Sequence, residues 1–355
     1  MTSQRTRKDL ALQINIHSHV VPRGINGMAG HYGPDVSVDD QGVLVIKFGG
    51  STFRADRVQS DNLDGDQPDY WTLLSDPRIR LEEMDEKGID VIGVSGTPLL
   101  YVYQIEAPIA HTFLASYNDE LAAYCQHAPD RLFFTAMLPL QDAALAVKEA
   151  HRAFGDLGAR GLNIGAGDIA GRDLDDRSLF PVYQAAVEHD VPLFVHPAPT
   201  PFVHGTEERH RESIILGYPY QESSAFLHLV LGGVFDEFPD LKVYLTHGGG
   251  FIPYQLGRIE IMSQIAFDRR NQRPVRDYLD NFYFDLLIHD VKARQFAVDA
   301  VGAERLVIGD NYQGMDSCDG FAYLDELTLT PEQDELIRWR NASTLFKLDS
   351  LRAPK

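Results

Sequence analysis

The sequence predicts an α/β fold in which eight parallel strands close into a distorted (β/α)8 TIM barrel. Short apolar runs alternate with longer helical patterns, there are eight such β–α units, and the residues suited to chemistry follow the predicted strands. A doubly wound open sheet is the competing fold, but no GxGxxG motif follows the first strand. We therefore expect the 355 residues to form a single barrel domain.

The predicted elements follow in order along the chain. The strands are short apolar or β-branched runs bounded by Gly, Asp and Pro, at residues 13–17, 90–95, 132–137, 160–164, 192–196, 242–246, 282–286 and 305–308. The helices between them are amphipathic segments, at residues 77–87, 110–127, 143–154, 179–189, 223–235, 253–265 and 291–301. Further helical sequence continues to Leu348 after the eighth strand.

One long insertion interrupts this alternation at residues 20–76, between the first strand and its helix. Within it, the alternating run 43–48, the pair Gly49-Gly50 and the run 51–54 predict a β-hairpin with a tight glycine turn. A segment inserted after a barrel strand lies over the mouth of the barrel. We therefore expect a small, lid-like hairpin insertion at this end.

The amino-acid composition limits the binding partners and the cellular compartment that we expect for this protein. The chain has 32 Lys+Arg against 52 Asp+Glu, a formal net charge of −20, which argues against nucleic acids and anionic membranes as partners. Cys125 and Cys318 form no CxxC motif, and the first 13 residues lack the apolar run of a secretory signal. We expect a cytoplasmic protein whose partner is a small molecule, held by local Arg or Lys if that molecule is an anion.

Three histidines are candidate metal ligands. His17 and His19 are two residues apart in a strand, so their side chains project from the same face. His196 closes the fifth strand and would lie at the same barrel mouth. Converging imidazoles suit Zn²⁺ or a similar divalent ion. The alternative is that each is a separate buried polar residue with a structural hydrogen bond.

His247 is a candidate acid–base residue. It closes the sixth strand and precedes three glycines, so the backbone can turn sharply beside a pocket. No Lys-Ser/Thr pair follows, which excludes a P-loop. We interpret His247 as a residue that exchanges protons beside a metal-bound water, with a purely structural histidine as the alternative.

Motifs along nearly the whole chain resemble the amidohydrolase superfamily, in the branch of the α-amino-β-carboxymuconate-ε-semialdehyde decarboxylases. The matching segments are IHSHVVP (16–22), FR (53–54), DPRIRLEEMDEKG (76–88), LFPVY (179–183), FVHP (194–197), GGVF (232–235), HGGG (247–250), LGR (256–258), FYFD (282–285) and HD (289–290). Relatives in this branch include decarboxylases, hydratases and C–C hydrolases, so the motifs identify the family more closely than the reaction.

The resemblance implies roles for individual residues. It implies one divalent metal ion, typically Zn²⁺ with Mn²⁺ as the alternative, ligated by His17, His19 and His196, and it makes His247 the catalytic histidine. Arg54 matches an arginine that binds the substrate carboxylate. Arg258 matches an arginine that reaches into the neighbouring subunit's site, so a homodimer is expected. Without the resemblance, Arg54 would be an exposed hairpin residue and Arg258 an ordinary charge on a helix surface.

Two departures from the family pattern affect the expected site. The family has an Asp ligand in a Gly-x-Asp-Tyr-Pro motif, whereas this chain has Gly-Asp-Asn-Tyr-Gln at 309–313. Either Asn311 ligates weakly, or a local shift brings Asp310 to the metal, or the site is three histidines and water. After His196-Pro197 the family decarboxylase has an aromatic and an acidic residue, whereas this chain has Ala198-Pro199. We therefore expect a different substrate.

The leading functional hypothesis is a metal-dependent lyase that decarboxylates an unsaturated or aromatic carboxylic acid. A metal-dependent hydrolase or hydratase with the same site is the second hypothesis, and CO₂ release would separate the two. A third is a metal-poor relative that binds or cyclises a metabolite, which the neutral Asn311 leaves open.

Overall fold

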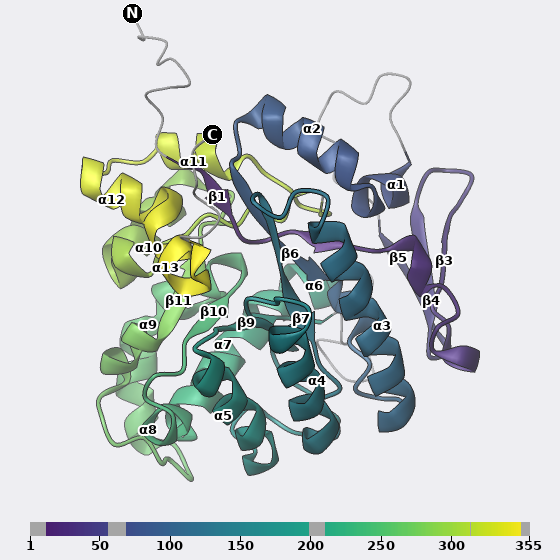
Figure 1. Cartoon of the computed structure of the whole chain (residues 1–355). Helices are drawn as coiled ribbons and strands as arrows, with labels where there is room; N and C mark the ends of the chain where they lie inside the picture. Colours follow the sequence, from purple (N-terminus) through teal and green to yellow (C-terminus); the bar gives the residue numbers. More distant parts are fainter. Residues whose placement is uncertain (1–11, 56–68, 199–209, 313, 349–355) are drawn as a thin grey trace, which may run out of the picture.

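The computed structural model describes residues 12–55, 69–198, 210–312 and 314–348 (Figure 1). In this part of the chain one sheet of nine parallel strands forms a barrel, with order β1-β6-β7-β8-β9-β10-β11-β12 and β2 paired with β6. The strands are β1 (Ile14–Asn15), β2 (His19–Val20), β6 (Val91–Gly96), β7 (Leu132–Met137), β8 (Leu162–Gly165), β9 (Leu193–His196), β10 (Val243–Leu245), β11 (Phe282–Asp285) and β12 (Leu306–Val307).

Hydrogen bonds between the first and last strands bring the two edges of the sheet together. The N–H of Ile16 donates to the carbonyl of Ile308 at 3.0 Å, and the N–H of Tyr312 donates to that of His17 at 2.9 Å. The predicted first strand is interrupted: β1 and β2 both pair with β6, and between them His17 N–H donates to the Asn15 side chain at 3.1 Å. The prediction of a distorted (β/α)8 barrel is confirmed, with the distortion at the strand that carries two of the candidate ligands.

The main helices lie around the outside of the barrel (Figure 1). They are α2 (Pro77–Lys87), α3 (Ala107–Cys125), α4 (Ala143–Gly155), α5 (Phe180–His189), α7 (Gly217–Leu231), α9 (Ile252–Met262) and α10 (Val291–Val301). The prediction of one helix over 223–235 is wrong, because α7 ends at Leu231 and α8 (Val234–Glu237) begins after Gly233. Gly233 has φ +75°, a left-handed conformation that breaks the helix and that glycine adopts without strain.

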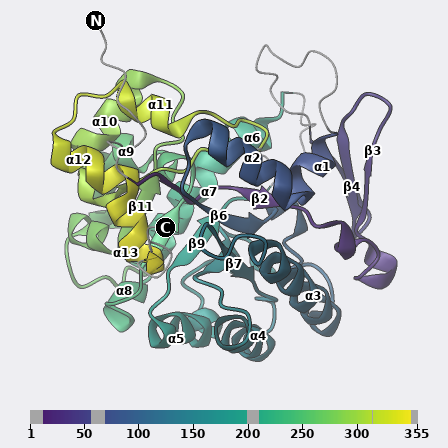
Figure 2. The same cartoon turned by 45° about the horizontal axis from the view of Figure 1, so that its top comes forward.

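Two apolar clusters stabilise the barrel. The larger one fills the layer between the sheet and the surrounding helices. The smaller one lies inside the barrel, where Phe133, Phe194 and Tyr244 share a cluster with Phe346 of α13 (Asn341–Phe346). Figure 2 shows α13 lying against the end of the barrel. This helix contacts β1 and β12, and the opposite, carboxyl ends of the strands are left for a functional site.

The inserted segment contains a small antiparallel sheet at the edge of the barrel near α3 (Figure 1). Strand β4 (Leu44–Phe48) pairs with β5 (Ser51–Ala55) through the Gly49-Gly50 turn, and β3 (Asp35–Val38), which the sequence analysis did not predict, pairs with β4. Residues 56–68 of the expected insertion lie outside the described part of the chain. Among the described helices, none combines the length and the apolar character needed to cross a bilayer.

Candidate active site

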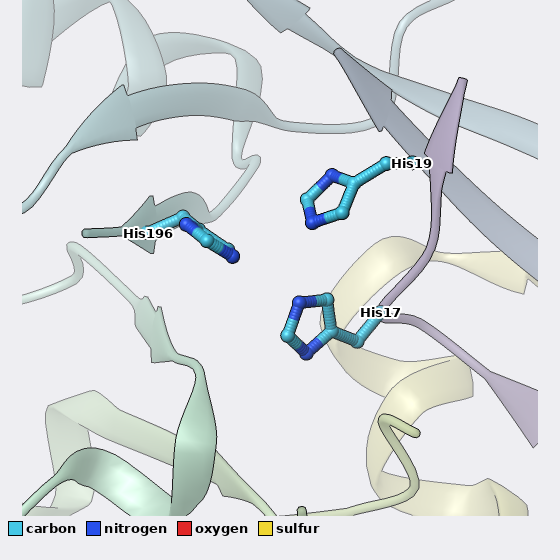
Figure 3. A group of neighbouring side chains, drawn as sticks. All are labelled: His17, His19 and His196. Atoms are coloured by element: carbon cyan, nitrogen blue, oxygen red, sulfur yellow. The ribbon is translucent and has the colours of Figure 1, made fainter. Parts of the chain in front are cut away.

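Three histidines from the first and fifth barrel strands meet at the carboxyl end of the barrel. Their ring centroids are 5.3 Å apart for His17–His19, 5.2 Å for His17–His196 and 4.9 Å for His19–His196. One nitrogen from each ring can be chosen so that all three lie within 4.8 Å of one another. Figure 3 shows the rings pointing into one common space. The predicted convergence of these side chains is therefore present in the structure.

Each of these rings is oriented by a neighbour through Nδ1. The contacts are His17 to Asp285 Oδ2 at 3.0 Å, His19 to Ser95 Oγ at 3.0 Å, and His196 to the Pro197 carbonyl at 2.6 Å. The Nε2 atoms of His17 and His196 are buried and have no hydrogen-bond partner among the described residues. Metal-binding histidines are usually held in this way, with one nitrogen bonded to the protein and the other left for the ion.

The electrostatics of the cluster favour neutral imidazoles. Burial lowers the pKa of His17, although Asp285 opposes the effect. Burial lowers the pKa values of His19 and His196 further, and the neighbouring imidazoles act in the same direction. Neutral imidazole is the form that binds a metal, and an unpaired buried nitrogen is costly unless something satisfies it. The three side chains therefore fit a single divalent cation.

His247 lies beside this cluster, with its ring centroid 5.2 Å from that of His17 and 5.0 Å from that of His196. Its Nδ1 lies 2.9 Å from Oε1 of Glu222, a fully buried residue of α7 that also accepts a hydrogen bond from Thr246. Burial alone would lower the pKa of His247, but the Glu222 carboxylate outweighs it and raises this pKa to about 9. The pair presents His247 as a proton donor whose remaining nitrogen, Nε2, is available to a ligand.

Glu222 is not among the residues predicted from the sequence. The only sequence signal for this residue was a lone acid at the start of an otherwise apolar helix pattern. Such a residue is usually exposed, and only the packing of α7 against the turn His247–Gly249 shows that this one is buried beneath His247.

A cavity of about 1120 Å³ opens above the histidines. Its lining includes His19, His196 and His247, and is otherwise largely apolar and aromatic, with Leu44 and Ala55 contributed by the inserted sheet. Among the described lining residues, Arg211 and Lys292 are the two that carry a permanent positive charge. A mostly apolar cavity of this size with a few convergent polar groups is typical of a small-molecule site.

The structure does not bring Arg54 to this cavity. Alternate residues of a strand face opposite sides, and on β5 it is Ala55 that lines the cavity. Arg54 is 50% exposed and forms an ion pair with Asp39 instead. Arg258 is exposed on α9 and does not line the cavity of its own subunit. Its predicted role across a subunit interface stays a prediction.

The two candidate residues after the eighth strand diverge. Asn311 lines the cavity, with φ +47°. Asp310 is buried away from it and accepts a hydrogen bond from Asn15, and burial raises its pKa to about 7. The structure thus places Asn311, and not Asp310, at the cavity.

Asp316 is a cavity residue that the sequence analysis missed. Burial alone would raise its pKa, but the nearby His289 side chain, the charge of His247 and the hydrogen bond from Asn311 hold this pKa well below its ordinary value. The cavity therefore contains an ionised carboxylate close to the histidines. It lies on an irregular loop, so no helix or strand periodicity could have identified it from the sequence.

Two relatives whose names state a reaction match most of this chain's length. The chain is 28% identical over 315 residues to a 2-amino-3-carboxymuconate-6-semialdehyde decarboxylase of Dictyostelium discoideum, covering 85% of this chain and 82% of the relative. It is 29% identical over 318 residues to a gamma-resorcylate decarboxylase of Polaromonas, covering 81% of this chain and 92% of the relative.

A solved structure shares the architecture. It is a 5-carboxyvanillate decarboxylase of Novosphingobium aromaticivorans, complexed with manganese and 4-hydroxy-3-methoxy-5-nitrobenzoic acid. The two superpose with a TM-score of 0.76 at 24% identity, over 95% of this chain and 96% of the other. The amidohydrolase family model matches residues 14–348, nearly the whole chain. Together with the barrel and its histidine cluster, this match shows that the protein belongs to the amidohydrolase family.

Proposed function

We propose that this protein is a metal-dependent decarboxylase of an aromatic or unsaturated carboxylic acid. One observation carries the proposal: three buried histidines with unpaired Nε2 atoms on His17 and His196 lie beside the His247–Glu222 pair, beneath a large apolar cavity. This arrangement supports a cation site and a proton donor next to a space suited to a planar organic acid. The decarboxylases among the relatives support the reaction class.

We propose Zn²⁺ as the ion and Mn²⁺ as the alternative. A set of three imidazoles is typical of zinc, whereas oxygen-rich sets suit manganese. His17, His19 and His196 would hold the ion, and Asn311 is the next residue at the cavity that could contribute an oxygen. When bound, a divalent ion of this kind supplies Lewis-acid stabilisation of negative charge on a substrate oxygen.

In the proposed reaction the bond between the substrate carbon and its carboxylate breaks, CO₂ leaves, and a proton takes its place on that carbon. His247 is suited to supply the proton from Nε2, because Glu222 engages Nδ1 and favours the protonated ring. The apolar lining excludes water, which favours departure of neutral CO₂ and protects the carbanion-like carbon from uncontrolled protonation.

Lys292 and Arg211 are the proposed partners of the substrate's negative charge. Both line the cavity, whereas Arg54 is engaged by Asp39 on the opposite face of the inserted sheet. A protein of net charge −20 must hold an anion by such local cations, since its overall field repels it. Charge-assisted hydrogen bonds to a carboxylate are strong enough for this task.

We also propose that the active protein is a homodimer formed through α9. Tyr254, Arg258 and Ile261 are spaced four and three residues apart, so they share one face of that helix. Tyr254 is 77% and Ile261 65% exposed, and Ile265, just beyond the helix, is 69% exposed. Large apolar residues in such a row are typical of a protein interface, and Arg258 would then enter the partner's cavity from within that row.

The experiment that tests the proposed reaction is a CO₂-release screen of the purified, metal-loaded protein. Carboxymuconate-like and hydroxybenzoate-like acids are the substrates, and the product is identified by mass. We expect loss of 44 mass units from at least one acid, with catalytic turnover. Gain of 18 mass units without CO₂ would instead show a hydratase, and two fragments whose masses sum to the substrate plus 18 would show a hydrolase; either result would contradict the decarboxylase proposal.

A further inference from the structure

The loop after β12 carries an amide and a carboxylate that contact each other at the cavity wall. Asn311 Nδ2 donates to Asp316 Oδ1 at 2.5 Å, and both residues line the cavity with the histidines. This contact uses the nitrogen end of the carboxamide. The other end, Asn311 Oδ1, is buried and has no hydrogen-bond partner among the described residues. A buried amide oxygen without a partner is costly, so a ligand there would gain from binding it.

Local packing fixes this amide in place. An added Cβ at Gly314 would lie 2.0 Å from Asn311 Oδ1, so the carboxamide lies directly against the backbone of Gly314, and a side chain there would displace it. Asn311 itself has φ +47°, a conformation that asparagine tolerates better than most residues. Asp316 Oδ2 also lies 3.7 Å from Nε2 of His289, within ion-pair distance if that histidine is protonated. The loop thus holds one defined orientation, with the amide nitrogen towards Asp316.

We propose that Asp316 is a positioning residue of the metal centre, which holds Asn311 so that its Oδ1 becomes the fourth protein donor to the ion. This inference rests on the proposed metal site. The hydrogen bond from Asn311 to Asp316 has a second consequence besides orienting the carboxamide. A carboxylate that accepts from an amide N–H polarises the amide and increases the electron density on its oxygen, which makes a neutral donor stronger. Asp316 would therefore supply the negative charge that Asn311 lacks, and it would do so through its hydrogen bond with Asn311.

The first test is the metal affinity of Asp316→Asn, measured on the purified chain by Zn²⁺ competition with a chromophoric chelator and by electron paramagnetic resonance of free Mn²⁺. Residues that hold a ligand typically contribute about 10- to 100-fold to metal affinity, and we expect a loss in that range. Asp299→Asn is the matched control, since it removes the same charge from an exposed residue of α10. Parental affinity in Asp316→Asn would overturn the proposal.

The second test is the swap Asn311→Asp/Asp316→Asn. It keeps one amide, one carboxylate and the hydrogen bond between them, but places the negative charge on the residue proposed to contact the ion. We expect affinity at least equal to that of the parent, and therefore well above that of Asp316→Asn. A swap variant more than about 10-fold weaker than the parent would overturn the proposal, even if Asp316→Asn alone failed to fold.

Two further readouts separate this inference from the proposed reaction. The melting temperature of the metal-free variants should stay close to that of the metal-free parent, whereas a merely structural role for Asp316 would lower it. Metal affinity is measured without substrate, so loss of affinity in Asp316→Asn supports the inference even if no acid tested releases CO₂. Conversely, decarboxylation with unchanged affinity would contradict the inference alone.

Discussion

The floor and the rim of the cavity are built in different ways. On the floor, His17, His19 and His196 extend from barrel strands or their ends, are almost completely buried, and are each oriented through Nδ1. At the rim, the charged groups lie on helices and loops: Lys292 is exposed on α10, and Arg211 is exposed just before α6 (Glu212–Ile215). The barrel backbone therefore positions the histidines, and we expect side chains outside it to determine which acid is bound. If that division holds, substitutions on the floor should cause larger losses of activity than substitutions at the rim.

His17→Ala should cause the largest loss of metal binding and activity. Removing one of three imidazoles should abolish metal binding and lower activity by about 10³-fold or more. The fold should survive, because Asp285 keeps hydrogen bonds from Tyr244 and from the backbone of Gly248. Metal analysis, kcat/KM and circular dichroism check this. His151→Ala, an exposed histidine of α4, is the control and should change none of them. Parental activity in metal-free His17→Ala would show that the histidine cluster is not a catalytic metal centre.

Glu222→Gln should lower kcat by about 100-fold, with little change in KM or metal content. Gln can still accept from His247 Nδ1, but it no longer supplies the charge that keeps the ring protonated. Steady-state kinetics with metal analysis of the same preparation check this. A variant that loses metal in proportion to its activity would instead assign Glu222 a structural role in the cluster.

Arg258→Ala tests whether part of the rim comes from a second subunit. Removing an arginine that binds a carboxylate should lower kcat/KM by roughly 10-fold or more. Mixing Arg258→Ala with inactive His247→Ala and exchanging subunits should restore activity above that of either protein alone, because one site of the mixed dimer then has both residues. The mixed dimer is isolated with two different tags. If that dimer shows no gain, Arg258 belongs to its own subunit's site or to no site.

Lys292→Ala and Arg54→Ala form a matched pair with the smallest expected effects. Lys292 lines the cavity, so its loss should raise KM by about 10-fold, while Lys292→Arg should recover most of the binding. Arg54 is half exposed and paired with Asp39, so its loss should change KM by less than about 2-fold. The opposite order would show that the inserted sheet moves on binding and brings Arg54 to the substrate.

The place of a residue in the barrel also decides whether its position in the site could be predicted from the sequence. His17, His19, His196 and His247 could be placed together because each ends or follows a barrel strand, and the carboxyl ends of parallel strands meet at one mouth. No such rule applies to Glu222, which is brought beneath His247 only by the packing of α7. The same holds for Asp316, whose position depends on the course of an irregular loop.

Two pairs of adjacent residues show why the sequence did not reveal which member of each pair faces the cavity. Asp310 and Asn311 are adjacent, yet one is bonded to Asn15 and the other lines the cavity, because the left-handed turn at Asn311 sends the two side chains apart. Arg54 and Ala55 differ in the same way on β5, where a shift of one residue exchanges the two faces of the strand. Sequence patterns identify strands well, but not the register of a small inserted sheet relative to a cavity.

The most direct test of the account is a metal titration of the chelator-treated protein, with CO₂ release as the readout. Once a substrate acid has been found, Zn²⁺ or Mn²⁺ is added to the metal-free chain in fractions of an equivalent. We predict no CO₂ release before addition, a linear rise in rate, and a plateau at one ion per chain, with no such rise in His17→Ala. Full CO₂ release from the metal-free protein, or a rise in His17→Ala that matches the parent, would contradict the account.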